Sequence, residues 1–103
     1  MRFDLAAASG IGEYKMVIEE GAEVYTVVKE GEEGKAFLVI WPKTIEVRCD
    51  GNLSRLLMEK YESVMKSRYF GRGGIEIVVS GQLEADEIYD LVRLSYNLTS
   101  EKA

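Results

Sequence analysis

The spacing of apolar residues changes at Asp50, and this change constrains the fold more than any other feature of the sequence. On its amino-terminal side, Ile45, Val47 and Cys49 alternate with polar residues, as in a strand with one buried face. On its carboxyl-terminal side the spacing becomes that of an amphipathic helix, with one face formed by Leu53, Leu56, Leu57, Tyr61 and Val64. Asp50 is suited to cap this helix, because its carboxylate can accept the free N–H groups of the first turn. A strand that leads directly into a helix predicts a domain containing both.

Three further strands are predicted before this change. They cover residues 13–19, 23–29 and 35–41. In the first of them, Tyr14, Met16 and Ile18 are expected to form the buried face. The second and third are rich in β-branched and aromatic residues, and they flank an acidic, glycine-containing loop at residues 30–34. With the strand that ends at Cys49, they predict a meander of about four strands.

The rest of the chain is predicted to add one strand and one helix. A glycine-rich loop at residues 67–74 precedes the strand, which covers residues 75–79. The last helix carries acids at its start, as the helix dipole favours. Its inward face consists of Ile88, Leu91, Val92, Ser95 and Tyr96. The predicted fold class is α+β, an antiparallel sheet of about five strands covered by two main helices. We expect a single domain over residues 1–103, in which residues 1–12 form a poorly defined segment with at most a short helical turn.

Composition narrows the functional classes. Thirteen basic and eighteen acidic residues give a net charge of -5, so any nucleic-acid site would have to be a local patch. No apolar run approaches the roughly 20 residues that span a bilayer. The acidic Asp4 falls where a secretion signal needs its apolar core, and the single cysteine, Cys49, cannot form an internal disulfide. We therefore expect a cytoplasmic protein with no membrane partner.

Several motifs in the second half of the chain occur together. Residues 45–50 (Ile-Glu-Val-Arg-Cys-Asp) close a strand and open a helix that ends near Tyr61, and the last helix carries the pair Ser95 and Tyr96. In these features the sequence resembles the MmcQ/YjbR family over residues 45–98. The family pattern is also matched at Val64, Gly81, Leu83, Ile88, Leu91 and Leu98.

The resemblance implies a compact α+β domain related to the double-wing fold, which is similar to a DNA-contacting domain of a phage transcription activator. Its members are mostly uncharacterised bacterial proteins, so the implied DNA role is an analogy of fold. The sequence departs from the family in the loop before the last strand. Gly-Arg-Gly-Gly-Ile at residues 71–75 stands where the family has Asn-Lys-x-His-Trp, and Ser-Arg-Tyr at residues 67–69 stands where Gly-Tyr-His is common. Within this loop the sequence keeps only the family's basic residue, here Arg72. The amino-terminal helix usual in the family looks shortened or missing.

No catalytic constellation is visible in the sequence. The chain contains no histidine, which removes Ser-His and Cys-His pairs and the commonest transition-metal ligand. Cys49 keeps the phase of the apolar strand residues, which predicts a buried small residue rather than a reactive thiol. The acids at the start of the last helix are better explained by the helix dipole than by a metal site. We therefore expect a protein that is not an enzyme and needs no cofactor or metal.

The remaining candidate is a short basic segment. Lys66, Arg68 and Arg72 are interleaved with Tyr69 and Phe70, a composition that can contact phosphates and stack on bases. A solvated loop and a contact surface for a protein partner fit the same residues. The sequence thus predicts a non-catalytic binding module that uses Lys66, Arg68, Tyr69 and Arg72. Its partner would be nucleic acid or another protein.

Self-association is a second hypothesis. An unpaired strand edge can pair with the same edge of another copy, which gives a homodimer. The strands at residues 23–29 and 75–79 are the expected edges.

Overall fold

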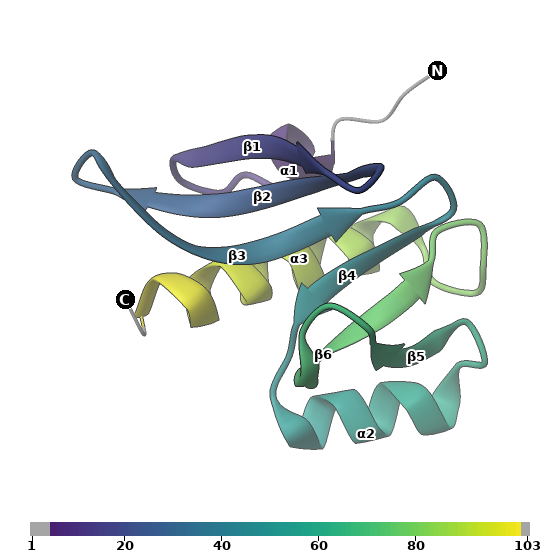
Figure 1. Ribbon diagram of the computed structural model, residues 1–103. Helices are drawn as coiled ribbons and strands as arrows, with labels where there is room; N and C mark the ends of the chain where they lie inside the picture. The colour runs from purple at the N-terminus through teal and green to yellow at the C-terminus, as the bar shows by residue number, and fades with distance from the viewer. Residues whose placement is uncertain (1–4, 102–103) are drawn as a thin grey trace.

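Six strands form one antiparallel sheet in the computed structural model, which describes residues 5–101 (Figure 1). The strands are β1 (Tyr14–Glu19), β2 (Ala22–Lys29), β3 (Glu32–Ile40), β4 (Thr44–Arg48), β5 (Val64–Ser67) and β6 (Gly71–Val78). The helices are α1 (Leu5–Ala8), α2 (Gly51–Lys60) and α3 (Ala85–Glu101). Across the sheet the order is β1-β2-β3-β4-β6-β5, so the predicted meander of the first four strands is confirmed. The observation about Asp4 falls outside the described residues.

The two longer helices lie on one face of the sheet. Helix α3 packs against β2, β3 and β4, and α2 packs against β5 and β6 (Figure 1). The α+β class is therefore as predicted, and the short turn of α1 fits the expectation for the amino-terminal segment. None of the described helices is long and apolar enough to cross a membrane.

Two Glu-Gly pairs form the turns of the first two hairpins. Glu20 and Gly21 have φ angles of 49° and 85°, and Glu30 and Gly31 have φ angles of 53° and 78°. Positive φ at both turn positions matches the twist of the flanking strands, and glycine adopts it without strain. The turn between β2 and β3 is therefore tighter than the loop expected at residues 30–34, because β3 already begins at its third residue.

Helix α2 begins where the apolar spacing changes. The Oδ1 atom of Asp50 accepts a hydrogen bond from the backbone N–H of Leu53 at 3.0 Å, so the predicted cap is confirmed. Leu53 and Leu57 pack against the core. The predicted helix face is wrong at two positions, since Leu56 is 63% exposed and Val64 lies in β5. The apolar spacing continues past the helix because a strand that buries Val64 in the same core follows at once.

The main core lies between the sheet and the helices. The inward face predicted for α3 is confirmed, because all five of its residues are buried. Ser95 ties this helix to two strands: its hydroxyl donates a hydrogen bond to the carbonyl of Phe37 at 2.6 Å and accepts one from the N–H of Arg48 at 2.8 Å. The fully buried core side chains include Val27, Phe37, Leu38, Ile45, Val47, Ile75, Ile77 and Val92.

Strand β1 lies at one edge of the sheet, and its burial differs from the prediction. Tyr14 is half-buried against the core, but Met16 is 43% exposed and Ile18 is 64% exposed. The predicted buried face is therefore wrong for these two residues. Alternation shows which side chains share a face of a strand, but it does not show whether another element covers that face.

The chain between α2 and α3 contains two strands where the sequence predicts one. Strand β5 is the additional one, and β6 begins at Gly71, so the loop expected at residues 67–74 shrinks to residues 68–70. The edges expected for self-association are also wrong, because residues 23–29 and 75–78 lie in the interior strands β2 and β6. The edges of the sheet are β1 and β5.

Gly74 in β6 allows Phe70 to close over the sheet. A Cβ atom at position 74 would lie 2.6 Å from the carbonyl oxygen of Val47 and 2.7 Å from the Cβ atom of Phe70. At the neighbouring Gly73, the nearest atom would be the carbonyl oxygen of Phe70 at 3.9 Å. Of these two adjacent glycines, only Gly74 stands where a side chain would clash with its neighbours.

We predict that Gly74→Ala lowers the free energy of unfolding by about 1–3 kcal/mol, the usual cost of forcing extra atoms into a packed region. Gly73→Ala is the matched control and should change it by less than about 0.5 kcal/mol. Urea denaturation followed by tryptophan fluorescence measures both variants. Equal losses in the two variants would contradict the contact assigned to Gly74.

Candidate functional site

Two glutamates lie next to each other on the face of the sheet opposite the helices, called the open face. Glu46 on β4 and Glu76 on β6 each stand between two residues that point into the main core, and they are direct cross-strand partners. Their exposed fractions are 0% and 4%. Two buried carboxylates in adjacent positions repel each other and lose hydration, so each needs its own hydrogen-bond donors.

Glu46 receives three donors from two separate segments. Its Oε2 atom accepts a hydrogen bond from the indole Nε1–H of Trp41 at 2.6 Å. Its Oε1 atom accepts one from the hydroxyl of Ser67 at 2.7 Å and one from the backbone N–H of Tyr69 at 2.8 Å. The Ser67 hydroxyl in turn accepts a hydrogen bond from the N–H of Phe70 at 2.9 Å. The carboxylate therefore holds the turn between β5 and β6 onto the sheet.

Glu76 is held by Arg68. The Nε and Nη2 atoms of Arg68 donate to its two carboxylate oxygens at 2.9 and 2.7 Å, and the hydroxyl of Thr44 donates to Oε2 at 2.7 Å. Burial raises the pKa of the Glu76 carboxyl, but the hydrogen bonds from Arg68 and Thr44 outweigh it, so the pKa lies below its ordinary value. The guanidinium of Arg68 also lies 4.7 Å from the ring centroid of Trp41. Its positive charge is thus shared between a carboxylate and an aromatic face.

A second guanidinium lies over a second ring on the open face. Arg48 is 4.7 Å from the ring centroid of Phe70, and its Nε atom donates to the carbonyl of Ala36 at 2.8 Å. Phe70 and Trp41 pack with small and branched residues of β1, β2 and β3 in a second apolar cluster. Its other members are Val17, Ala22, Val24, Ala36 and Val39. The open face therefore has its own packing and is not a bare sheet surface.

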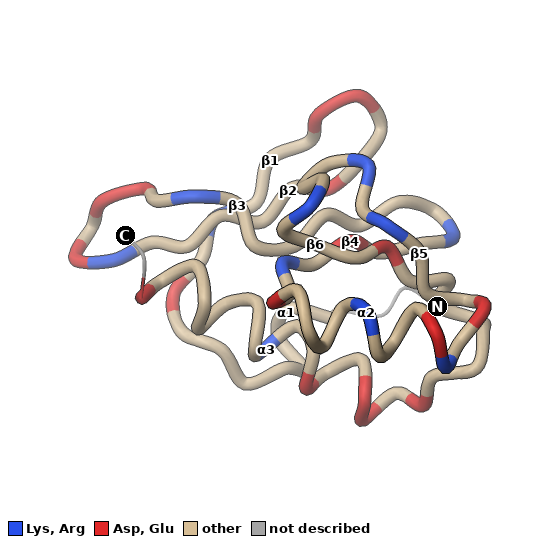
Figure 2. Tube along the Cα trace, turned by 90° about the horizontal axis from the view of Figure 1, so that it is seen from below, with Lys and Arg blue, Asp and Glu red and all other residues tan. Residues whose placement is uncertain are grey.

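The four predicted binding residues do not form one group. Arg68 and Tyr69 belong to the turn held by Glu46, and Arg72 is exposed near the start of β6. Lys66 is the cross-strand partner of Ile75, a residue of the helix-side core. Its side chain therefore lies on the helix side of the sheet and not on the open face. Figure 2 shows basic positions along the chain between β5 and β6, and acidic positions at the outer turns of the first two hairpins.

Three residues that organise this surface are missing from the sequence prediction. Trp41, Glu46 and Glu76 sit at polar phases or at the ends of predicted strands, where solvent exposure is the simple expectation. The sequence does contain one indication that the two glutamates are buried. A glutamate occupies the central position of two apolar strands that turn out to be neighbours, Ile45–Val47 and Ile75–Ile77. Only the pairing of these strands reveals that the two acids meet.

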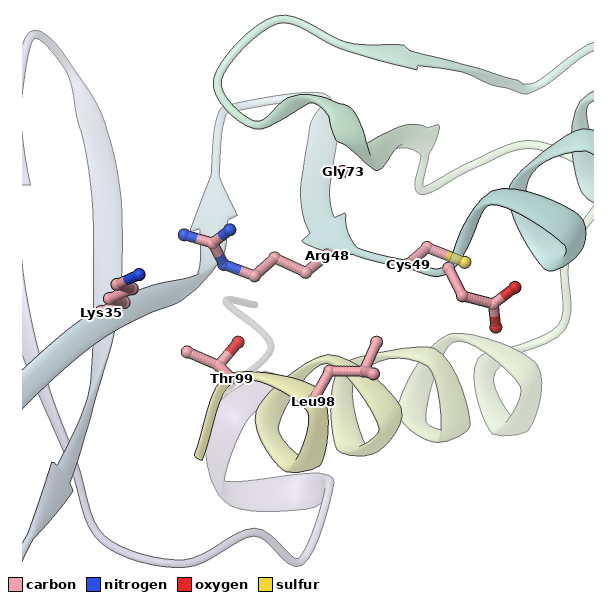
Figure 3. Close-up of a pocket in the computed structure, with 7 residues that line it drawn as sticks. Lys35, Arg48, Cys49, Gly73, Leu98 and Thr99 are labelled. Carbon is pink, nitrogen blue, oxygen red and sulfur yellow. The ribbon is translucent and has the colours of Figure 1, made fainter. Parts of the chain in front are cut away.

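A pocket lies at the strand-to-helix corner. Its volume is about 170 Å³, and it lies between β3, the corner after β4, β6 and the end of α3 (Figure 3). Its wall is formed by Lys35, Arg48, Cys49, Asp50, Gly73, Leu98 and Thr99. Burial raises the pKa of the Cys49 thiol, and the charge of Asp50 acts in the same direction, so the thiol stays protonated at neutral pH. Cys49 is 6% exposed, which confirms its predicted burial.

Glu76 makes the stability of the protein depend on pH. Its pKa is lower in the folded state than in the unfolded chain, so its contribution is present above the unfolded value of 4.5 and is lost as the pH falls through the folded value. We predict that Glu76→Gln destabilises the protein most at neutral pH, and that its difference from the wild type shrinks below about pH 4. Urea denaturation over a series of pH values measures this difference.

The matched control is Glu59→Gln, which removes an exposed carboxylate from α2. It separates the effect of the Arg68–Glu76 pair from that of changing the net charge. A difference between Glu76→Gln and the wild type that stays constant between neutral and acid pH would contradict the assigned ion pair.

Comparison with known proteins bears on the fold. No protein-family model matches the sequence, and no curated protein is significantly similar to it. The crystal structure of Deinococcus radiodurans protein DR2400, which contains a DUF419 domain, is similar to this chain with a TM-score of 0.81. The match covers 94% of this chain and 75% of that chain at 13% sequence identity. DUF419 is the MmcQ/YjbR-like family, so the resemblance in sequence and the likeness in structure point to the same group. At this identity the likeness establishes the fold: this chain folds as the DUF419 protein DR2400 does.

Proposed function

We propose that this chain is a non-catalytic binding module that contacts a partner protein through the β5–β6 hairpin. The contact surface, called the hairpin face, consists of Trp41, Met65, Arg68, Tyr69 and Arg72. Met65 is the cross-strand partner of Glu76, and Arg72 stands two residues before Gly74 on β6, so the alternation of the strands directs both toward the open face.

The bidentate pair of Arg68 and Glu76 carries this proposal. It fixes the guanidinium over the indole of Trp41, so an aromatic and a charged group are in position before a partner arrives. Such preorganisation lowers the entropy cost of binding. Beside them Tyr69 is 45% exposed and Met65 is 40% exposed. Tryptophan, tyrosine, methionine and arginine are the residue types enriched where proteins contact each other.

The titratable groups with raised pKa values support a non-catalytic role. Burial raises the pKa of the Tyr96 hydroxyl, and the charge of Glu13 adds to this effect. The same hydroxyl donates a hydrogen bond to the backbone carbonyl of Glu13 at 2.7 Å, which is a structural use. Cys49 likewise keeps its proton. Neither group is poised as a nucleophile or a base at neutral pH.

Nucleic acid is the second candidate partner. The exposed ring of Tyr69 and the exposed cation of Arg72, three residues further along the chain, favour it, because bases stack on aromatic rings and phosphates pair with cations. The charge balance opposes strong binding, since Glu46 and Glu76 lie directly beneath the turn and Arg68 is already paired. The net charge of -5 adds a general repulsion. We therefore expect DNA binding to be weak and easily abolished by salt.

We predict that a photo-crosslinking amino acid at position 69 captures one dominant protein in the native cell, whereas the same amino acid at position 59 on α2 does not. With the captured protein purified, Tyr69→Ala combined with Arg72→Ala should weaken binding about tenfold or more, as loss of interface anchors does. Glu59→Ala should leave the affinity unchanged. Fluorescence anisotropy measures each dissociation constant.

The competing outcomes are distinct. Unchanged affinity in the double variant would place the contact outside the hairpin face. Titration with single-stranded and duplex DNA at low salt tests the second candidate. Binding of DNA at micromolar concentration that falls steeply with salt and is lost in Arg72→Ala, with no protein captured from position 69, would overturn the proposed protein contact.

A further inference from the structure

Two cations line the corner pocket, which shares none of its lining residues with the hairpin face. Lys35 comes from β3 and Arg48 from the end of β4, and both line the same cavity. Figure 3 draws both side chains at the pocket, Lys35 on β3 and Arg48 at the end of β4. Within residues 5–101, neither forms an ion pair with an acidic side chain. Two neighbouring positive charges without a carboxylate partner favour a bound anion.

Arg48 is held so that its charged end can receive a ligand. Its Nε atom donates to the carbonyl of Ala36, and Phe70 supports the guanidinium from one side. These contacts fix the orientation of the group through one nitrogen and one face. The terminal amino groups can then donate two parallel hydrogen bonds, a geometry that matches a carboxylate or a phosphate.

The rest of the wall sets the kind of anion. Leu98 and the protonated Cys49 offer apolar contact, and Gly73 presents backbone without a side chain. The carboxylate of Asp50 also belongs to the wall, but its Oδ1 atom is engaged by the N–H of Leu53 as the cap of α2. The first turn of α2 is thus already capped by Asp50, so Lys35 and Arg48 are the groups of the wall that can hold a negative charge.

The size of the cavity limits the ligand. A volume of about 170 Å³ is below the roughly 300–1,000 Å³ of pockets that enclose drug-sized molecules. A nucleotide or a long peptide would not be enclosed. A phosphate group, or a carboxylate with a short apolar part, matches both the volume and the mixed wall.

We propose that this pocket is a binding site for a small oxyanion, a phosphate or a carboxylate group, held between Lys35 and the guanidinium of Arg48. The apolar wall at Leu98 receives the remainder of the ligand. This site shares no residue with the hairpin face, and it adds a small ligand to the macromolecular partner considered above.

Titration with inorganic phosphate and with acetate, followed by ¹H–¹⁵N NMR, tests the proposal. We expect saturable shifts of the backbone signals of Gly51, Gly73 and Thr99 with at least one of the two anions, at constant ionic strength. The anion that saturates at lower concentration identifies the group. In Lys35→Met the apparent affinity should fall about tenfold or more, because one charge-assisted hydrogen bond is lost.

Lys43→Met is the matched control, since it removes an exposed lysine from the turn at the other end of β4. Lys35 is also exposed, and its side chain donates no hydrogen bond to any other residue between positions 5 and 101, so its variant should unfold at the same urea concentration as the wild type. Met65→Ala should bind the anion as the wild type does, which separates this site from the hairpin face. No saturable shift with either anion, or equal affinities of Lys35→Met and Lys43→Met, would overturn the proposal.

Discussion

The structure of the open face depends on the hydrogen bonds that the buried carboxylate of Glu46 accepts. It accepts hydrogen bonds from Trp41 just after β3, from Ser67 at the end of β5 and from Tyr69 in the following turn. A carboxylate with no exposed surface is tolerated only where donors replace its lost water. Because these donors lie on separate segments, one side chain fixes how the last hairpin lies on the sheet. The stacking of Arg68 on Trp41 follows from that placement.

Strand β4 connects the two sides of the molecule. On the helix side, the N–H of Arg48 donates to Ser95 of α3, while its guanidinium lies over Phe70 on the open face and lines the corner pocket. Next to it, Glu46 organises the hairpin face. The helix side thus supplies most of the buried apolar surface, and the open side carries the groups that are exposed in fixed positions. The proposed contact surface lies where buried partners hold polar groups in place, because binding to groups that are already ordered costs less conformational entropy.

Much of the fold could be predicted from local patterns, and much of the site could not. The meander, both main helices and the Asp50 cap follow from periodicity and capping chemistry. Strand β5 could not be predicted, because Met65 and Lys66 are exposed and show no apolar alternation. The glycines at positions 71, 73 and 74 indicated a loop, but they lie in β6, where Gly74 is needed for the close approach of Phe70. The roles of Arg68 and Tyr69 depend on Glu46 and Glu76, whose meeting is a consequence of strand pairing across the sheet. Local sequence carries no record of such a long-range contact.

Hydrogen exchange of the Tyr69 amide measures how firmly Glu46 holds the hairpin, because this N–H donates to Glu46 and lies in a turn that would otherwise expose it. We expect the Tyr69 amide and the Trp41 indole N–H to exchange at least about a hundredfold more slowly than the amide of Gly31 in the turn between β2 and β3, after correction for intrinsic rates. Glu46→Gln should accelerate both, while the amides of α3 keep their protection. A Tyr69 amide that exchanges as fast as that of Gly31 in the wild-type protein would contradict the claim that Glu46 holds the hairpin.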